Sequence, residues 1–417
     1  MAQWWQYEAE QDAHDIKYYY EYQPGSQTAE SYPPLKTNYC FVTAFYDLGR
    51  DQWHHYARGA HKYVLYFSKL VQINMPLIVF VDDRYYAEVT KLINQFNYRR
   101  TFILLIPINE SFLEQYIPSW QYIATDEAIM QSSQFKAAVA HRLIKNTPET
   151  LYPRYTCFNH AKIDFVMFVQ QHKLARTSYF ALEDISVDAA ANDTNVRTVE
   201  YLGWIDFGYV RHNDAIIPFE LNEDLLMTAS SSDGSSRGSD RSQSYADSDF
   251  ITERLWSESN SSLTAAVVEN VDGSAVDASF VIGQAATEQP QQQHSHRIHL
   301  MQTELLTPED ADPLHTHHFA PSRILGGFYF GHHSVLTTFA AQYHQTVVEL
   351  HQRGIADDDQ AVVINRYFKQ PDMFKLWRNL NLIEGVTYQG LYVVHLLFNK
   401  HTTRRKDVQA FIDANKD

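Results

Sequence analysis

Between residues 38 and 107, short apolar runs alternate with amphipathic stretches, and this alternation constrains the fold more than any other feature of the sequence. The apolar runs have the length and composition of buried strands, at residues 39–46, 76–81 and 101–107. The stretches between them, about residues 56–73 and 85–96, repeat apolar side chains at helical spacing. Strand, helix and strand in succession form a parallel βαβ unit, so we expect a doubly wound α/β sheet flanked by helices.

Further strands and helices are expected beyond this region. We predict a central strand at 201–205, a helix at 160–172, a helix ending near Arg353, and strands within 384–398. The polar stretch 183–200 is typical of a surface excursion. We therefore divide the chain into an irregular arm (1–37), the first part of the core (38–222), an acidic low-complexity insert expected to be disordered (223–299), and the continuation of the core (300–417).

Composition limits the classes of partner. The formal net charge is -16, and more than half of this excess falls within 222–290, which disfavours nucleic-acid binding because phosphate contacts need clustered Lys and Arg. Two cysteines form neither a disulfide framework nor a thiolate metal site. No apolar stretch reaches the roughly 20 residues of a membrane span, and the start lacks the pattern of a signal peptide. We expect a cytoplasmic or cytosol-facing protein.

Carboxylates follow several of the predicted strands. Asp47 follows the first, Asp82 and Asp83 follow the second, and Asp206 follows the strand at 201–205. Open α/β sheets bind ligands at the carboxyl ends of their strands, where a carboxylate can hold a divalent ion or a ribose hydroxyl. The alternative for each residue is a capping aspartate at a turn.

Asp206 is the strongest metal candidate among these residues. One carboxylate alone holds a metal weakly, so a complete Mn²⁺ or Mg²⁺ site would need a second protein ligand, plus diphosphate oxygens and water. We select His332, with His333 as the alternative, beyond the Gly326-Gly327 pair. Asp206-Phe207-Gly208 also spells a kinase metal motif, but the sequence has no G-x-G-x-x-G loop or His-Arg-Asp loop upstream. The kinase interpretation is therefore excluded.

Other residues suit the binding and transfer of a group. Lys162 and Arg211 are candidate counter-charges for a diphosphate. The glycines at 326–327, beside Phe328, would let the backbone pass close to a sugar, although a tight turn before a helix explains them equally. Asp359 and Gln360 open a predicted helix, where a carboxylate caps the dipole or acts as a general base.

Six segments taken in order resemble the HtrL/YibB family. They are VTAFYDLGR (42–50), PLIVFVD (76–82), NHAK (159–162), WIDFG (204–208), GGF (326–328) and DQ (359–360). The resemblance covers about 38–220 and 322–377, and it implies a GT-A-like glycosyltransferase fold; bacterial members are associated with lipopolysaccharide core assembly. The insert and the polar excursion are not part of the family's usual pattern.

The resemblance also implies roles for individual residues. It places Asp47 and Asp82 near a nucleotide, Lys162 near its phosphates, and Asp206 at the metal or diphosphate position. Gly326 and Gly327 would lie on the acceptor side and Asp359 near the reacting centre. The full candidate sets are Asp47, Arg50, Asp82, Asp83, Lys162 and Arg211 for the donor, Gly326, Gly327 and Phe328 for the acceptor, Asp206 and His332 for the metal, and Asp359 and Gln360 for catalysis.

Three functions stay open at this stage. The first is a glycosyltransferase that moves a sugar from a nucleotide-sugar donor to a glycan or other acceptor, with retention or inversion undetermined. The second is a non-catalytic relative that binds a glycan or a partner, which the lone Asp206 favours. The third is a nucleotidyl- or phosphotransferase, which would use the same strand-end carboxylates.

Overall fold

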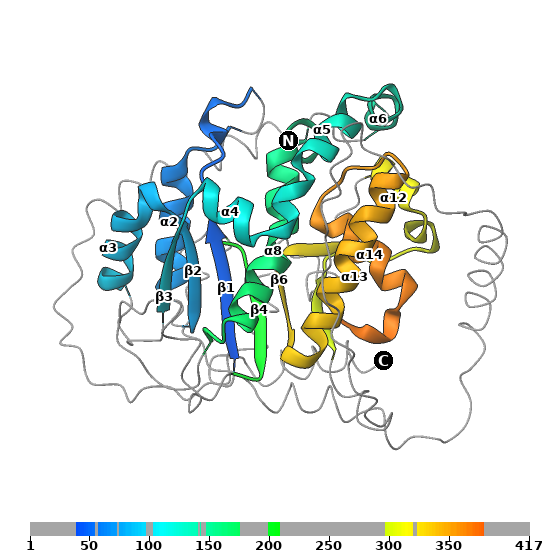
Figure 1. Cartoon of the computed structure of the whole chain (residues 1–417). Coiled ribbons are helices and arrows are strands. Elements are labelled where there is room, and N and C mark those ends of the chain that lie inside the picture. The colour runs from blue at the N-terminus through cyan, green and yellow to red at the C-terminus, as the bar shows by residue number, and fades with distance from the viewer. Residues whose placement is uncertain are drawn as a thin grey trace, which may run out of the picture. The chain divides into compact units, whose positions relative to one another are not determined.

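The computed structural model describes residues 39–54, 57–72, 75–96, 103–140, 142, 147–175, 199–208, 297–319 and 323–378. Residues on both sides of segment 231–295 belong to the same unit (Figure 1). The predicted arm, most of the polar excursion, the strands within 384–398, Arg211 and nearly all of the acidic insert lie outside the described residues.

The centre of the fold is a seven-stranded sheet with the order β3-β2-β1-β4-β6-β5-β7. Its strands are β1 (Tyr39–Phe45), β2 (Leu77–Asp82), β3 (Ile103–Ile108), β4 (Tyr201–Ile205), β5 (Ile298–Gln302), β6 (Ile324–His332) and β7 (Phe374–Arg378). β6 runs antiparallel to both of its neighbours, and the other pairings are parallel. The carboxyl ends of β1, β2 and β4 therefore meet the beginning of β6 at one edge.

Two helices cover one face of the sheet. They are α2 (Ala60–Gln72) and α3 (Tyr86–Phe96), which Figure 1 shows in blue beside β2 and β3. Their apolar side chains, such as Phe67 and Leu92, pack with alternate strand residues such as Phe41 and Val79. The period of two along each buried strand sends its other residues to the opposite face.

The opposite face carries α8 (Pro153–Gln171), α13 (His333–Gln352) and α14 (Asp359–Lys369). Most of α8 is buried because it packs between β1 and β4 on one side and α5 (Ile123–Gln131), η3 (Pro118–Tyr122) and α13 on the others. A helix enclosed in this way needs apolar residues all round, and its polar side chains need partners. Lys162 and Asp164 are such buried polar residues. None of the described helices is long and apolar enough to cross a bilayer.

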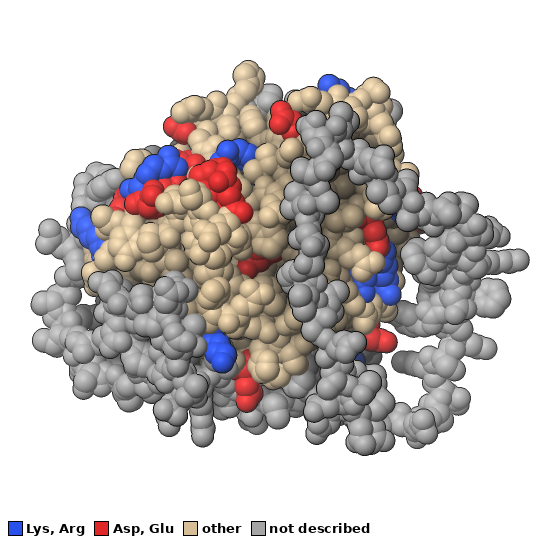
Figure 2. Space-filling view, viewed as in Figure 1, with Lys and Arg blue, Asp and Glu red and all other residues tan. Residues whose placement is uncertain are grey.

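The remaining described helices are short. They comprise α4 (Glu110–Tyr116), α6 (Ser133–Val139), α7 (Pro148–Leu151) and α12 (Pro313–Phe319), with the 3-10 turns η1 (Arg50–Gln52), η2 (Asp83–Tyr85), η6 (Pro308–Ala311) and η7 (Pro371–Met373). Figure 2 shows that positive and negative side chains lie close together on the visible face. Among the described residues, that face shows no large field of one sign.

The predicted α/β class and its first strands are confirmed, and β4 has the predicted bounds. Residues 326–331, predicted as a flexible turn, instead lie within β6. Their aromatic residues follow the period of a strand: Phe328 and Phe330 pack on the α2 face, and Tyr329 packs on the α8 face. β5 and β7 were not predicted, and β5 begins inside the stretch that we assigned to the insert.

Candidate functional site

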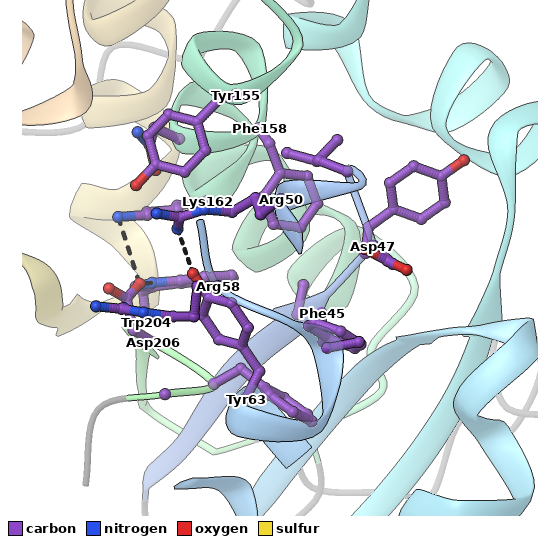
Figure 3. Close-up of a pocket in the computed structure, with 17 residues that line it drawn as sticks. Phe45, Asp47, Arg50, Arg58, Tyr63, Tyr155, Phe158, Lys162, Trp204 and Asp206 are labelled. Atoms are coloured by element: carbon purple, nitrogen blue, oxygen red, sulfur yellow. Dashed lines mark hydrogen bonds and ion pairs between the residues drawn. The ribbon is translucent and has the colours of Figure 1, made fainter. Parts of the chain in front are cut away.

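A pocket of about 810 Å³, part of it open to solvent, lies at the carboxyl ends of β1 and β4. We call it the main pocket. Its walls come from the residues after β1, the beginning of α2, the first half of α8 and the residues after β4 (Figure 3). This is the edge at which open α/β sheets bind their ligands. Four of the predicted residues line it: Asp47, Arg50, Lys162 and Asp206.

Lys162 connects four elements of the structure. Lys162 lies in the middle of α8. Its Nζ donates to Asp359 Oδ2 at 2.8 Å and to the carbonyl oxygen of Gly326 at 3.1 Å. The same Nζ lies 3.3 Å from Asp206 Oδ1, and Figure 3 shows this ion pair at one end of the main pocket. The Asp206 side chain is 40% exposed, whereas those of Lys162 and Asp359 are each 10% exposed. Asp206 therefore faces the pocket, and Asp359 lies behind Lys162.

The charges of this cluster depend on one another. Burial alone would lower the pKa of Lys162, but the carboxylates of Asp206 and Asp359 outweigh burial and raise it. Burial raises the pKa of Asp359 to about 6, because the attraction of Lys162 only partly offsets desolvation and the charge of Asp206. Asp359 is thus a carboxylate that exchanges its proton close to neutral pH.

The beginning of α14 holds Asp359 in place. Asp358 is the N-cap, and its Oδ1 accepts from the backbone N–H of Ala361 at 3.1 Å. Asp357 Oδ2 lies 2.6 Å from Nη2 of Arg142 and 2.8 Å from Nδ1 of His317. The side chains of Arg142, His317 and Asp357 are all buried, so their contacts fix the direction in which α14 starts.

Gly326 explains how α14 comes this close to β6. A Cβ atom at this position would lie 2.8 Å from both carboxylate oxygens of Asp359 and 2.9 Å from Cγ of Gln360. The predicted close approach is therefore real, but the neighbour is the helix that carries Asp359. The backbone of Gly327 pairs with Asp206, whose N–H donates to its carbonyl oxygen at 2.9 Å. Phe328 is fully buried in the core, so its side chain has no exposed surface at the site.

The main pocket also contains side chains that the sequence did not single out. Arg58, Tyr63 and Tyr155 line it together with Arg50. The Arg50 guanidinium carbon lies 4.9 Å from the ring centre of Trp53 and 5.0 Å from that of Tyr155. That of Arg58 lies 5.6 Å from the Tyr63 ring. Arg58 lies between β1 and α2, Tyr63 in α2 and Tyr155 in α8, so the fold and not a local sequence pattern brings them to the pocket.

Asp82 and Asp83 border a second hollow of about 580 Å³, the side pocket, which Asp47 also lines. Asp82 accepts from Nε of Arg84 at 2.8 Å and from the backbone N–H of Asp47 at 3.1 Å. Burial would raise the pKa of Asp82, but the bonds from Arg84 lower it. Asp47 in turn accepts from the hydroxyl of Tyr85 at 3.0 Å. Asp82 thus stabilises the loop, as in the capping alternative, while Asp83 is exposed.

The predicted metal pair does not form. His332 pairs with Tyr201 at the beginning of β4, whereas Asp206 follows its end. With ~3.3 Å per residue in a strand, roughly 15 Å separates the two positions. Asp206 Oδ1 also accepts from Nε1 of Trp204 at 2.7 Å. Within the described ranges no three His, Cys, Asp or Glu side chains converge as ligands.

Gln360 lines a small third cavity of about 20 Å³, the inner pocket, on the side of Lys162 that faces α13 and α14. Asn159, Tyr343 and Asp359 also line it. The structure therefore brings Lys162, Asp206, Gly326, Asp359 and Gln360 together, with Arg50 and Asp47 in the adjoining main pocket.

Comparison with known proteins agrees with one part of the sequence analysis. Residues 37–197 match the model of a family described as "Bacterial protein of unknown function (HtrL_YibB)". The predicted resemblance to HtrL/YibB is confirmed over these residues. Protein HtrL of Escherichia coli (strain K12) is 26% identical over 182 residues, which are 42% of this chain and 52% of that protein. The chain thus spans about half of the length of this relative. No solved structure matches.

The family match covers only part of the site. It includes Asp47, Arg50 and Lys162, and it ends before Asp206 and Asp359. Lys162 therefore lies within the matched range, while Asp206 and Asp359 lie outside it.

Proposed function

We propose that this chain is a glycosyltransferase that moves a sugar from a nucleotide-sugar donor to a glycan or other acceptor. One observation carries the proposal: a pocket at the carboxyl ends of β1 and β4 combines aromatic rings and cations with a nearby buried carboxylate whose pKa is raised to about 6. Such a combination suits a ligand with a flat base, a diphosphate and a reacting sugar.

The main pocket would bind the donor. Phe45 and Tyr63 offer ring surface for a base, and Asp47 offers a carboxylate for ribose hydroxyls. Arg50, Arg58 and Lys162 would contact the diphosphate, which becomes the leaving group and therefore gains negative charge in the transition state.

Asp359 would act as the general base. A group with a pKa near 6 is mostly ionised at neutral pH and can still accept a proton from an acceptor hydroxyl. Gln360 and Asn159 line the inner pocket beside Asp359 and would orient that hydroxyl. Asp206 faces the main pocket and would hold Lys162 toward the donor.

The topology supports the same class of function by analogy. The sheet is mixed, with the order β3-β2-β1-β4-β6-β5-β7 and β6 antiparallel, and such an α/β sheet is compatible with the GT-A-like fold that the HtrL/YibB resemblance implies. A fold by itself does not fix an activity, so this support is secondary to the site. Both cysteines are buried free thiols, which fits the cytoplasmic or cytosol-facing location that we propose.

The test is a nucleotide-sugar turnover assay on the full chain. We expect release of a free nucleoside diphosphate from one donor of a panel, and we expect Asp359→Asn to lower the rate at least ~100-fold while the protein stays folded and binds the donor. Asp372→Asn, at an exposed position, is the matched control. Release of the sugar 1-phosphate instead would indicate nucleotidyl transfer. Turnover unchanged in Asp359→Asn would refute the role of Asp359.

A non-catalytic binding protein is the second candidate. The observation that favours it is that Lys162 engages both carboxylates of the cluster in one network. A binder of this kind would bind a nucleotide or glycan with similar affinity in the parent and in Asp359→Asn, and it would release no product from any donor.

A further inference from the structure

We propose that the donor diphosphate is bound without a divalent cation, by Lys162 together with Arg50 and Arg58. This inference rests on the proposed function and specifies how its donor site works. It follows from the position of Lys162, whose ammonium group lies between the carboxylates of Asp206 and Asp359. These are the two carboxylates that lie within reach of Lys162 near the end of β4.

The ammonium group and a cation compete for the same place. Nζ of Lys162 lies 2.8 Å from Asp359 Oδ2 and 3.3 Å from Asp206 Oδ1, so an ion bound to both oxygens would lie almost on top of it. Like charges at such separations repel strongly in a buried environment. Magnesium also demands near-octahedral oxygen ligands, whereas Asp206 Oδ1 already accepts from Trp204. Lys162 therefore supplies the positive charge at this position.

Two arginines extend this charge into the main pocket. Figure 3 shows Arg50 and Arg58 grouped with Lys162 near Asp206, while Asp47 lies apart from them. The Arg50 and Arg58 guanidinium groups lie against the faces of Trp53, Tyr155 and Tyr63. Stacking uses the flat face of a guanidinium, while a phosphate is bound through its N–H edge, so the two contacts are compatible. The aromatic rings thus orient two phosphate-binding side chains.

The three cations come from separate elements but border one pocket. Arg50 belongs to the turn after β1, Arg58 precedes α2, and Lys162 lies in α8. The backbone N–H of Arg58 donates to the carbonyl oxygen of Arg50 at 3.1 Å, which ties the two arginines together in one loop. A diphosphate carries its charge over two adjacent groups, so a cluster of separate cations can neutralise it as a metal would.

The proposal is tested by measuring nucleotide binding with and without a divalent cation. Calorimetry would compare nucleoside diphosphates, nucleotide sugars and inorganic pyrophosphate in EDTA and in millimolar Mn²⁺ or Mg²⁺. We expect the preferred nucleotide to bind with a Kd that differs less than about threefold between the two conditions. Affinity at least tenfold tighter with metal would overturn this inference and leave the proposed function standing. No binding of any probe in either condition would overturn both.

A variant separates an anion-binding role of Lys162 from a structural one. In Lys162→Ala, we expect nucleotide affinity in EDTA to fall at least tenfold. Because the carboxylates of Asp206 and Asp359 are then released, Mn²⁺ should restore part of this affinity in the variant alone. Lys91→Ala, at an exposed position on α3, is the matched control and should bind as the parent does. Unchanged affinity of Lys162→Ala in EDTA would overturn the proposal.

Arg58 provides a second variant that leaves the buried ion pairs intact. In Arg58→Gln, we expect at least a fivefold loss of affinity for the diphosphate and no change for the nucleoside alone, because only the diphosphate carries the charge. Equal losses for both ligands, or none, would contradict the assignment of Arg58. Circular dichroism and thermal unfolding establish that each variant is folded before binding is measured.

Discussion

Nζ of Lys162 and Oδ2 of Asp359 lie 2.8 Å apart, although 197 positions separate the two residues in the chain. The contact joins α8 to the beginning of α14 and lies next to Gly326 of β6, whose carbonyl oxygen accepts from the same Nζ. Small changes in the packing of α14 against β6 should therefore alter the charged cluster directly. The following predictions test this dependence and the polar contacts that support it.

A methyl group at position 326 should displace Asp359. In Gly326→Ala, the new Cβ would lie 2.8 Å from both carboxylate oxygens, so either Asp359 or α14 must shift. We expect a loss of about 1–3 kcal/mol in the free energy of unfolding, typical of overpacking, together with a marked fall in turnover. Denaturant unfolding and the turnover assay measure the two effects.

Gly59→Ala is the matched control for this variant. A Cβ at position 59 would meet nothing within 4 Å, and this glycine is not held at positive φ. Its stability should stay within about 0.5 kcal/mol of the parent. Equal behaviour of the two variants would contradict the role assigned to Gly326.

The rate of sugar transfer should depend on pH through Asp359. Since the pKa of this carboxyl is raised to about 6, it is protonated and inactive as a base below that pH and becomes active above it. We therefore expect kcat/KM to rise between about pH 5 and 7 with a midpoint near 6. A pH profile of the parent measures this, and a rate that stays flat over the range would exclude Asp359 as the base.

Removal of the buried guanidinium of Arg142 should destabilise the fold. Arg142→Met leaves Asp357 buried without its 2.6 Å partner, and loss of one member of a buried pair costs about 3–5 kcal/mol. The double variant Arg142→Met with Asp357→Asn should recover part of this loss, because no uncompensated charge remains. Denaturant unfolding measures both.

The surface pair of Arg154 with Glu110 is the corresponding control. Arg154→Met removes a pair whose side chains are 49% and 39% exposed, and exposed pairs contribute at most about 1 kcal/mol. If Arg142→Met and Arg154→Met lost similar amounts of unfolding free energy, the buried contacts among Arg142, His317 and Asp357 would not fix α14.

Two buried histidines should make stability fall in mild acid. Burial lowers the pKa of His160 to about 4 and that of His299 to about 3. Below the unfolded value of 6.5 the unfolded chain binds protons that these folded imidazoles do not, so stability declines as pH falls from about 6.5 toward 4. Each imidazole contributes a slope of at most about 1.4 kcal/mol per pH unit. Unfolding free energies between pH 7 and 5 measure this slope.

His160→Gln isolates one of the two contributions. It can keep a polar contact with the hydroxyl of Tyr343, which lies 2.8 Å from Nδ1 in the parent, and it does not titrate. The dependence on pH should therefore be shallower in the variant. A slope equal to that of the parent would contradict the protonation account.

The sequence predicted the parts of the fold that depend on local pattern. β1, β2, β3 and β4 are buried runs of apolar residues, and their hydrophobicity alone marks them. β5 follows a polar stretch, and β5 and β7 interrupt their apolar residues with polar or charged side chains. His299 is one of them: it is buried, and it accepts from Nε1 of Trp377 at 2.9 Å.

The candidate site, like the fold, was predicted only where a local sequence pattern marks its residues. Strand ends located Asp47 and Asp206, but the direction of β6 determines which end of it meets them, and the direction of a strand is not written in its residues. His332 was therefore expected beside Asp206 and lies at the far end of β4. Arg58 and Tyr63 were missed because they depend on how the loop before α2 folds over the pocket, which no local pattern encodes.

The strand pairing joins β4 to a partner that is synthesised much later. β4 ends at Ile205, whereas its partner β6 begins at Ile324. While the intervening residues leave the ribosome, β4 can pair with β1 but its other side is an open edge, and an open edge can pair with a strand of another chain. Lys162 and Asp206 are likewise made long before Gly326 and Asp359. We therefore expect a nascent chain or a truncated product that stops before β6 to expose one edge of β4 and to lack Gly326 and Asp359, which favours aggregation during this interval.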